Sequence, residues 1–63
     1  MNRITRELIN SLDQCIISNS TLAEIRMSEW YLDTISIKDV GKLKKYTVEL
    51  EHPYDINTYY VKE

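Results

Sequence analysis

The sequence has 63 residues, of which 43% are apolar and 29% are charged, and its formal net charge is −2. That balance is typical of a folded domain, and so short a chain has room for one core, which excludes separate cofactor and substrate domains. One cysteine excludes an internal disulfide and, with a single histidine, cannot complete a four-ligand zinc site, so oligomerisation is the remaining supplement to a small core.

The first predicted element is an amphipathic helix from Arg3 to Ser18. Its apolar residues recur at helical spacing and form one stripe. Asn2 is a suitable N-cap, and the polar residues 18–20 provide a stop. The stripe consists of Ile4, Leu8, Ile9, Leu12, Cys15 and Ile16.

Two interpretations compete for residues 21–27. Thr21 and Glu24 have the spacing of a capping box, which would begin a second helix. From Ala23 to Met27, however, apolar and polar residues alternate with a period of two, as they do in a strand. We favour the strand.

The next segment must change direction. Trp30 and Leu32 have the opposite parity to Ile35 and Ile37, so one flat strand cannot bury all four side chains. We therefore expect a bulge or turn near residues 33–34.

Residues 36–43 are consistent with a short capped helix or with a hairpin in which Gly41 supplies a positive φ, and we favour the hairpin. Residues 45–51 alternate cleanly and predict a half-buried strand. Residues 52–57 contain the only proline and indicate a loop. Residues 58–62 predict a last strand that pairs back antiparallel, with Tyr59 and Val61 facing the core.

Together these elements predict an α+β fold in one domain over residues 1–63. An N-terminal amphipathic helix packs on one face of a three- or four-stranded antiparallel β-meander.

The candidates for catalysis and metal binding are weak. Gly41 is the only glycine, so the sequence contains neither a glycine-rich phosphate loop nor a nucleophile elbow. Cys15 belongs to the apolar stripe, which indicates a buried and inert thiol, and nothing in the spacing brings His52 to it. Glu49 and Glu51 share one strand face, and such a carboxylate pair is typical of a solvated surface. We therefore expect no enzyme, no cofactor and no metal.

The aromatic residues are the most informative feature. A helix-covered sheet of this size has room for about half of its six aromatic rings, because each buries on the order of 150–250 Å². Outward aromatic rings are typical of protein interfaces and equally of cross-strand pairs on the solvated face of a sheet. The hypothesis is a small non-catalytic protein-binding module, a regulator or inhibitor that occupies a surface of a larger protein or acts as a homodimer. The expected anchors are Trp30, Tyr31, Tyr54 and Tyr60, with Glu24, Arg26, Lys45 and Glu49 as a polar rim.

A nucleic-acid-binding regulator is the alternative. Ammonium groups follow phosphates while aromatic rings stack on bases, and the basic block lies next to tyrosines. The acidic net charge and the glutamates of the same strand oppose this interpretation. The residues concerned are Lys38, Lys42, Lys44 and Lys45.

The expected location is the cytoplasm. No apolar run is long enough for a membrane span or a secretory signal, and a lone cysteine suits a reducing compartment. Enrichment in Ile, Lys, Asn and Tyr is typical of an A+T-rich gene, such as one carried by a microbial mobile element.

Overall fold

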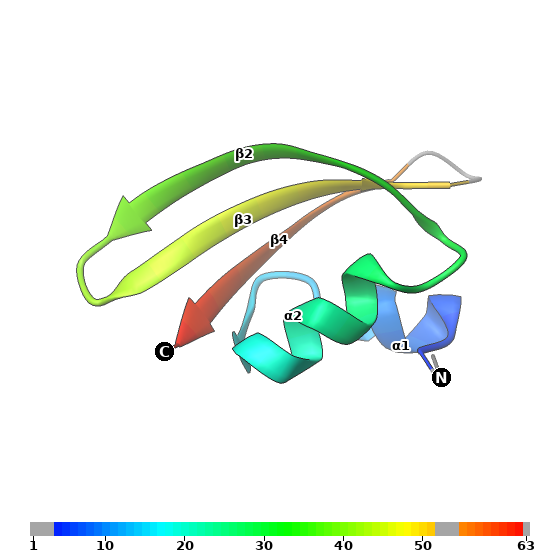
Figure 1. The fold of residues 1–63 in the computed structure, drawn as a ribbon, viewed down its shortest axis with the longest axis horizontal. Helices are drawn as coiled ribbons and strands as arrows, with labels where there is room; N and C mark the ends of the chain where they lie inside the picture. The colour runs from blue at the N-terminus through cyan, green and yellow to red at the C-terminus, as the bar shows by residue number, and fades with distance from the viewer. Residues whose placement is uncertain (1–3, 52–54, 63) are drawn as a thin grey trace.

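A four-stranded sheet with two helices on one side forms the molecule (Figure 1). The structure is a computed structural model and describes residues 4–51 and 55–62. The elements in chain order are α1 (Arg6–Ser11), β1 (Cys15–Ser18), α2 (Asn19–Arg26), β2 (Tyr31–Val40), β3 (Leu43–Leu50) and β4 (Asp55–Lys62). The predicted α+β class is confirmed.

The sheet is mixed rather than purely antiparallel. Its strand order is β1-β4-β3-β2, and β2, β3 and β4 form the predicted antiparallel meander. The edge strand β1 pairs parallel to β4, with Cys15 opposite Tyr59 and Ser18 opposite Lys62. The fourth strand therefore comes from the segment between the two helices.

The predicted N-terminal helix is too long at both ends. Thr5 is the N-cap of α1, with its hydroxyl accepting from the Leu8 amide at 3.2 Å, whereas the predicted cap, Asn2, lies outside the described residues. The helix ends at Ser11, and Gln14 then adopts a φ of 62°. That left-handed conformation redirects the chain into β1, whose branched isoleucines fit a pleated sheet better than a helix.

The strand expected for residues 23–27 is wrong, because this segment is the helix α2. The Ser18 hydroxyl caps it by accepting from the Thr21 amide at 3.2 Å. Leu22 and Ile25, three positions apart, are buried on one helical face, while Ala23 is exposed. Helical spacing and a cap outweigh the alternation that favoured a strand.

The meander agrees closely with the sequence. Pairing of β2 with β3 shifts register between Tyr31 and Asp33 and again between Thr34 and Ser36, which confirms the predicted irregularity. The hairpin is confirmed as well: Val40 pairs with Leu43 across a two-residue turn that Gly41 opens with a φ of 63°. A glycine with positive φ at the first position is what a type II′ turn requires.

Strand β4 begins earlier than expected. Residues 55–57, predicted as loop, already pair with β3, and the remainder of that loop, residues 52–54, lies outside the described part of the chain. Tyr59 and Val61 are fully buried, as the alternation predicts.

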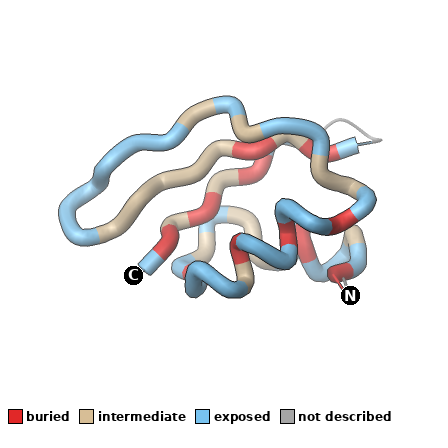
Figure 2. Tube along the Cα trace, in the orientation of Figure 1, coloured by how far each residue is buried: buried red, intermediate tan, exposed pale blue. Residues whose placement is uncertain are grey.

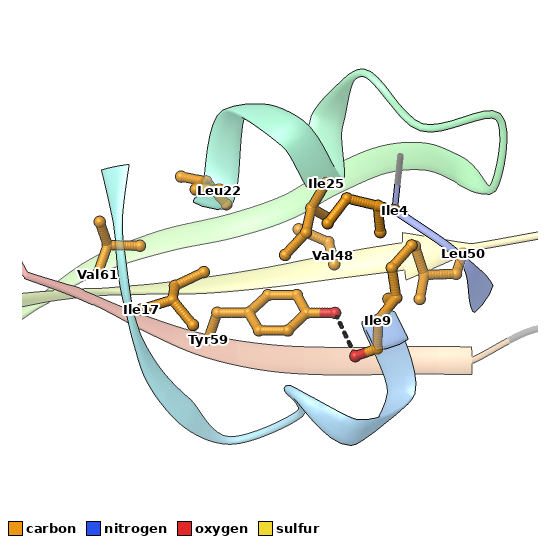
Figure 3. Close-up of a cluster of buried hydrophobic side chains, with 9 residues drawn as sticks. All are labelled: Ile4, Ile9, Ile17, Leu22, Ile25, Val48, Leu50, Tyr59 and Val61. Atoms are coloured by element: carbon orange, nitrogen blue, oxygen red, sulfur yellow. Dashed lines mark hydrogen bonds between the residues drawn. The ribbon is translucent and has the colours of Figure 1, made fainter. Parts of the chain in front are cut away.

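The core lies between the helices and the inner strands (Figures 2 and 3). Its buried apolar residues, among those described, are Ile4, Ile9, Ile17, Leu22, Ile25, Val48, Leu50, Tyr59 and Val61. The Tyr59 hydroxyl donates to the Ile9 carbonyl at 3.2 Å and accepts from the Asn57 amide at 3.1 Å. Burial raises the pKa of Tyr59 to about 12.

Tyr59 makes stability depend on alkaline pH. Below about pH 10 its phenol is neutral in the folded and unfolded chains, but between about pH 10 and 12 the unfolded chain releases the proton first. We expect the free energy of unfolding of the wild type to fall by about 2 kcal/mol across this window relative to Tyr59→Phe. Urea unfolding at a series of pH values measures this difference, and Tyr60→Phe is the control that should follow the wild type. An equal loss of unfolding free energy in the wild type and in Tyr59→Phe would contradict the raised pKa of Tyr59.

The cap of α2 gives a second prediction. Ser18→Ala removes the oxygen that accepts from the Thr21 amide, so the free energy of unfolding should fall by about 1 kcal/mol. The neighbouring exposed Asn19→Ala, which leaves that hydrogen bond in place, should change it by less than about 0.5 kcal/mol. Chemical denaturation compares the two variants, and equal losses would show that the cap is not the cause.

Candidate functional site

One face of the sheet carries no helix. Both helices lie on the side where Val48, Leu50, Tyr59 and Val61 are buried (Figures 1 and 3). Side chains alternate along a strand, and paired residues share a face, so the register assigns the residues of the opposite side, here called the open face. These are Ile16, Ser18, Asp33, Ser36, Lys38, Val40, Leu43, Lys45, Thr47, Glu49, Ile56, Thr58, Tyr60 and Lys62.

Four rows of the open face cross the strands in register, and each has its own chemistry. The row nearest the hairpin turn consists of Ser18, Lys62, Leu43 and Val40. The basic row consists of Ile16, Tyr60, Lys45 and Lys38. The middle row consists of Thr58, Thr47 and Ser36. The acidic row consists of Ile56, Glu49 and Asp33. Within a row, neighbouring strands lie about 4.8 Å apart.

Like charges stand directly opposite each other in the basic row and in the acidic row. Lys38 pairs with Lys45, and Asp33 pairs with Glu49. Such cross-strand pairs destabilise a sheet by a few tenths to about 1 kcal/mol. The ion pairs found among the described residues, Arg6–Asp55 and Lys44–Asp39, use none of these four side chains. The open face therefore has two separated and uncompensated charge clusters of opposite sign.

Large apolar side chains are exposed beside these charges. On the open face, Ile16 is 63% exposed and Ile56 is 55% exposed. The long edge strand β2 exposes Val40 on the open face, Ile37 on the covered face, and Leu32 and Ile35 at the two register shifts. Exposed aliphatic groups next to charges are typical of a surface that contacts another macromolecule.

The structure does not bring the three described aromatic anchors together. Tyr60 lies on the open face, half-buried between Ile16 and Lys45 of its row. Tyr31 pairs with Leu50 on the covered face, and Trp30 is half-buried; both pack against the core. Tyr54 lies outside the described residues. Among the described anchors, only Tyr60 belongs to the open face.

The expected lysine block is divided between the two faces. Lys38 and Lys45 lie on the open face, Lys42 occupies the turn, and Lys44 lies on the covered face with its ammonium group 3.6 Å from Asp39. Lys62, which was not among the predicted residues, joins the open face two positions beyond Tyr60. The alternation of the last strand was the signal that could have found it.

The expected polar rim divides in the same way. Lys45 and Glu49 lie on the open face, whereas Glu24 and Arg26 are exposed on α2, on the helix side of the sheet. Ile16 and Ile56 belong to the open face but were missed, because the sequence placed them in a helix and a loop.

The remaining chemical groups form no further site in the part of the chain that the structure describes. Cys15 packs against the core and its thiol lies 3.7 Å from the Ser11 carbonyl. The described side chains include no cluster of three metal-ligating groups and enclose no pocket. Neither described helix has the length and apolarity needed to cross a bilayer. His52 lies outside the described residues.

Comparison with known proteins gives no match to a family model, to a curated protein or to a solved structure.

The lysine pair offers a direct test of the open-face register. Lys38→Glu replaces a like-charged cross-strand pair with an opposite one, so the dilute chain should gain about 0.2–1 kcal/mol in free energy of unfolding. Lys42→Glu makes the same change of net charge in the turn and is the matched control. Urea unfolding at low ionic strength measures both, and the gain should shrink as salt is added. An equal effect of the two substitutions would contradict the pairing.

Proposed function

We propose that this chain is a small non-catalytic protein-binding module and that the open face is its binding surface. The observation that carries the proposal is the contrast between the two faces of one sheet. The helix side buries Val48, Leu50, Tyr59 and Val61 and exposes Ile37 only towards the hairpin end, whereas the other side exposes Ile16 and Ile56 beside charges that no ion pair of the described residues neutralises. A regulator or inhibitor needs only such a surface, because it acts by covering part of its target.

Tyr60 is the proposed anchor of this surface. A half-buried tyrosine ring contributes large contact area at the cost of few rotatable bonds and keeps a polar hydroxyl at its tip. Ile16 and Lys45 flank it in the basic row, so an apolar and a charged neighbour define its surroundings. Lys45 and Glu49 then orient the partner from the basic row and the acidic row. The cytoplasm is the expected location.

Nucleic acid is the second candidate. Lys38, Lys45 and Lys62 share the open face with Tyr60, and no described ion pair neutralises them. Lysines around a tyrosine suit a single strand, which stacks bases and pairs phosphates. The acidic row on the same face repels phosphates, so we place this function second.

Two exposed apolar residues on opposite sides of the sheet provide a matched test. Ile56→Lys places a charge on the open face, whereas Met27→Lys places the same charge at the end of α2, where Met27 is 67% exposed. Both should keep the wild-type stability, because neither side chain is buried. Protein partners recovered from nuclease-treated lysate and quantified by mass spectrometry should be lost with Ile56→Lys and kept with Met27→Lys.

The opposite result, loss with Met27→Lys alone, would move the binding surface to the helices. Loss of every partner after nuclease treatment would favour nucleic acid.

A further inference from the structure

The open face has a pattern that is complementary to itself. In each of three neighbouring strands, the basic row and the acidic row hold residues that suit each other. These combinations are Tyr60 with Ile56 on β4, Lys45 with Glu49 on β3, and Lys38 with Asp33 on β2. The two rows lie on either side of the middle row.

We infer that the open face binds a second copy of this chain, face to face, across a two-fold axis. The axis lies midway between the two sheets and parallel to them. It runs perpendicular to the strands and passes over the middle row. Such an axis places the basic row of one copy over the acidic row of the other. Homodimers of this kind use the same patch on both subunits, which requires self-complementarity. This inference rests on the proposed use of the open face for binding.

The pairing compensates the charges that each monomer leaves opposed. Lys45 lies over Glu49 of the second copy, and Lys38 lies over Asp33 of the second copy. Both like-charged pairs, which destabilise the isolated sheet, then face opposite charges at once. Asp33 can take part because only its Oδ1 is used internally, accepting from the Thr34 amide at 2.8 Å.

Apolar contact follows from the same symmetry. Tyr60 lies over Ile56 of the second copy, and the exchange repeats this contact on the other side of the axis. Ile56 is 55% exposed in the single chain, so the contact removes an apolar side chain from water.

The middle row sets the distance between the sheets. Thr58, Thr47 and Ser36 are small, so they let two sheets approach to the separation of about 10 Å that stacked sheets adopt. Large side chains in these positions would hold the rows apart.

Charge complementarity favours a second copy over nucleic acid. A phosphate chain that contacts Lys38 and Lys45 also meets Asp33 and Glu49 on the same face, about four residues along the strands. A second copy presents an acid to Lys38 and to Lys45, and a lysine to Asp33 and to Glu49. No other partner is needed to satisfy all four charges.

Charge reversal in two complementary variants tests the inference. The lysine-reversed variant carries Lys38→Glu and Lys45→Glu, and the acid-reversed variant carries Asp33→Lys and Glu49→Lys. Sedimentation velocity over a range of concentrations should show a dimer for the wild type. In each variant alone, self-association should weaken by about tenfold or more, because like charges now face each other across the axis. An equimolar mixture of the two should restore a dimer, and native mass spectrometry should identify it as the mixed species.

A control variant separates this geometry from general attraction between oppositely charged chains. Glu24→Lys with Glu29→Lys changes the net charge as the acid-reversed variant does, but on exposed positions outside the open face. It should keep the wild-type dimer and should not take up the lysine-reversed variant. Far-UV circular dichroism checks the fold of each variant. If a double variant unfolds, the single substitutions Lys45→Glu and Glu49→Lys replace it in the same mixing experiment.

A wild type that stays monomeric, a dimer that neither variant weakens, or a mixture that fails to reassociate would each overturn the inference. A monomer that binds oligothymidylate through Lys38 and Lys45 would also overturn it. A monomer that loses a different protein partner on Ile56→Lys would refute the dimer and leave the proposed function standing.

Discussion

Burial of the Tyr59 phenol is the constraint on which the rest of the structure depends. The ring lies in the inner strand β4, and its hydroxyl requires a polar partner inside an apolar core. The Ile9 carbonyl and the Asn57 amide provide that partner, and the first of them belongs to α1. Two more contacts fix the same region, since the Thr58 amide donates to Asp13 at 2.5 Å and its carbonyl accepts from the Gln14 amide. A helix of six residues is too short to be stable alone, so these contacts to β4 hold it in place.

That arrangement decides which side of the sheet is left open. Because α1 is bound to the Tyr59 side of β4, and Ser18 leads directly from β1 into α2, both helices cover the same face. The alternate residues of β4, including Ile56 and Tyr60, therefore point to the other side. The open face is thus a direct consequence of how the core is closed.

The sequence predicts the local features well and the long-range ones poorly. The hairpin at Gly41 and the irregularity near Asp33 follow from turn chemistry and parity within a few residues, and both are present. Ile16 was placed in a helix because its spacing fits a stripe, but its branched side chain pairs with the distant Tyr60 in a sheet. Of the candidate site, alternation along a strand identifies Tyr60, Lys45 and Glu49, and the basic block identifies Lys38. The complementarity between the basic row and the acidic row depends on the register of three strands. Contacts between residues far apart in the sequence set that register, so a short stretch of sequence does not show it.

The parallel pairing of β1 with β4 also has a consequence for the order of folding. Cys15 pairs with Tyr59, which is 44 positions further along the chain, and β4 lies between β1 and the hairpin of β2 and β3. The hairpin of β2 and β3 closes over a two-residue turn and is free to form first, since local contacts carry a small loop-closure entropy. Both helices can dock only after β4 has joined the hairpin, because β4 provides part of the surface on which they pack. Assembly is consequently expected to be a late, single cooperative event, in which the first third of the chain acquires its structure only after the last strand has been synthesised.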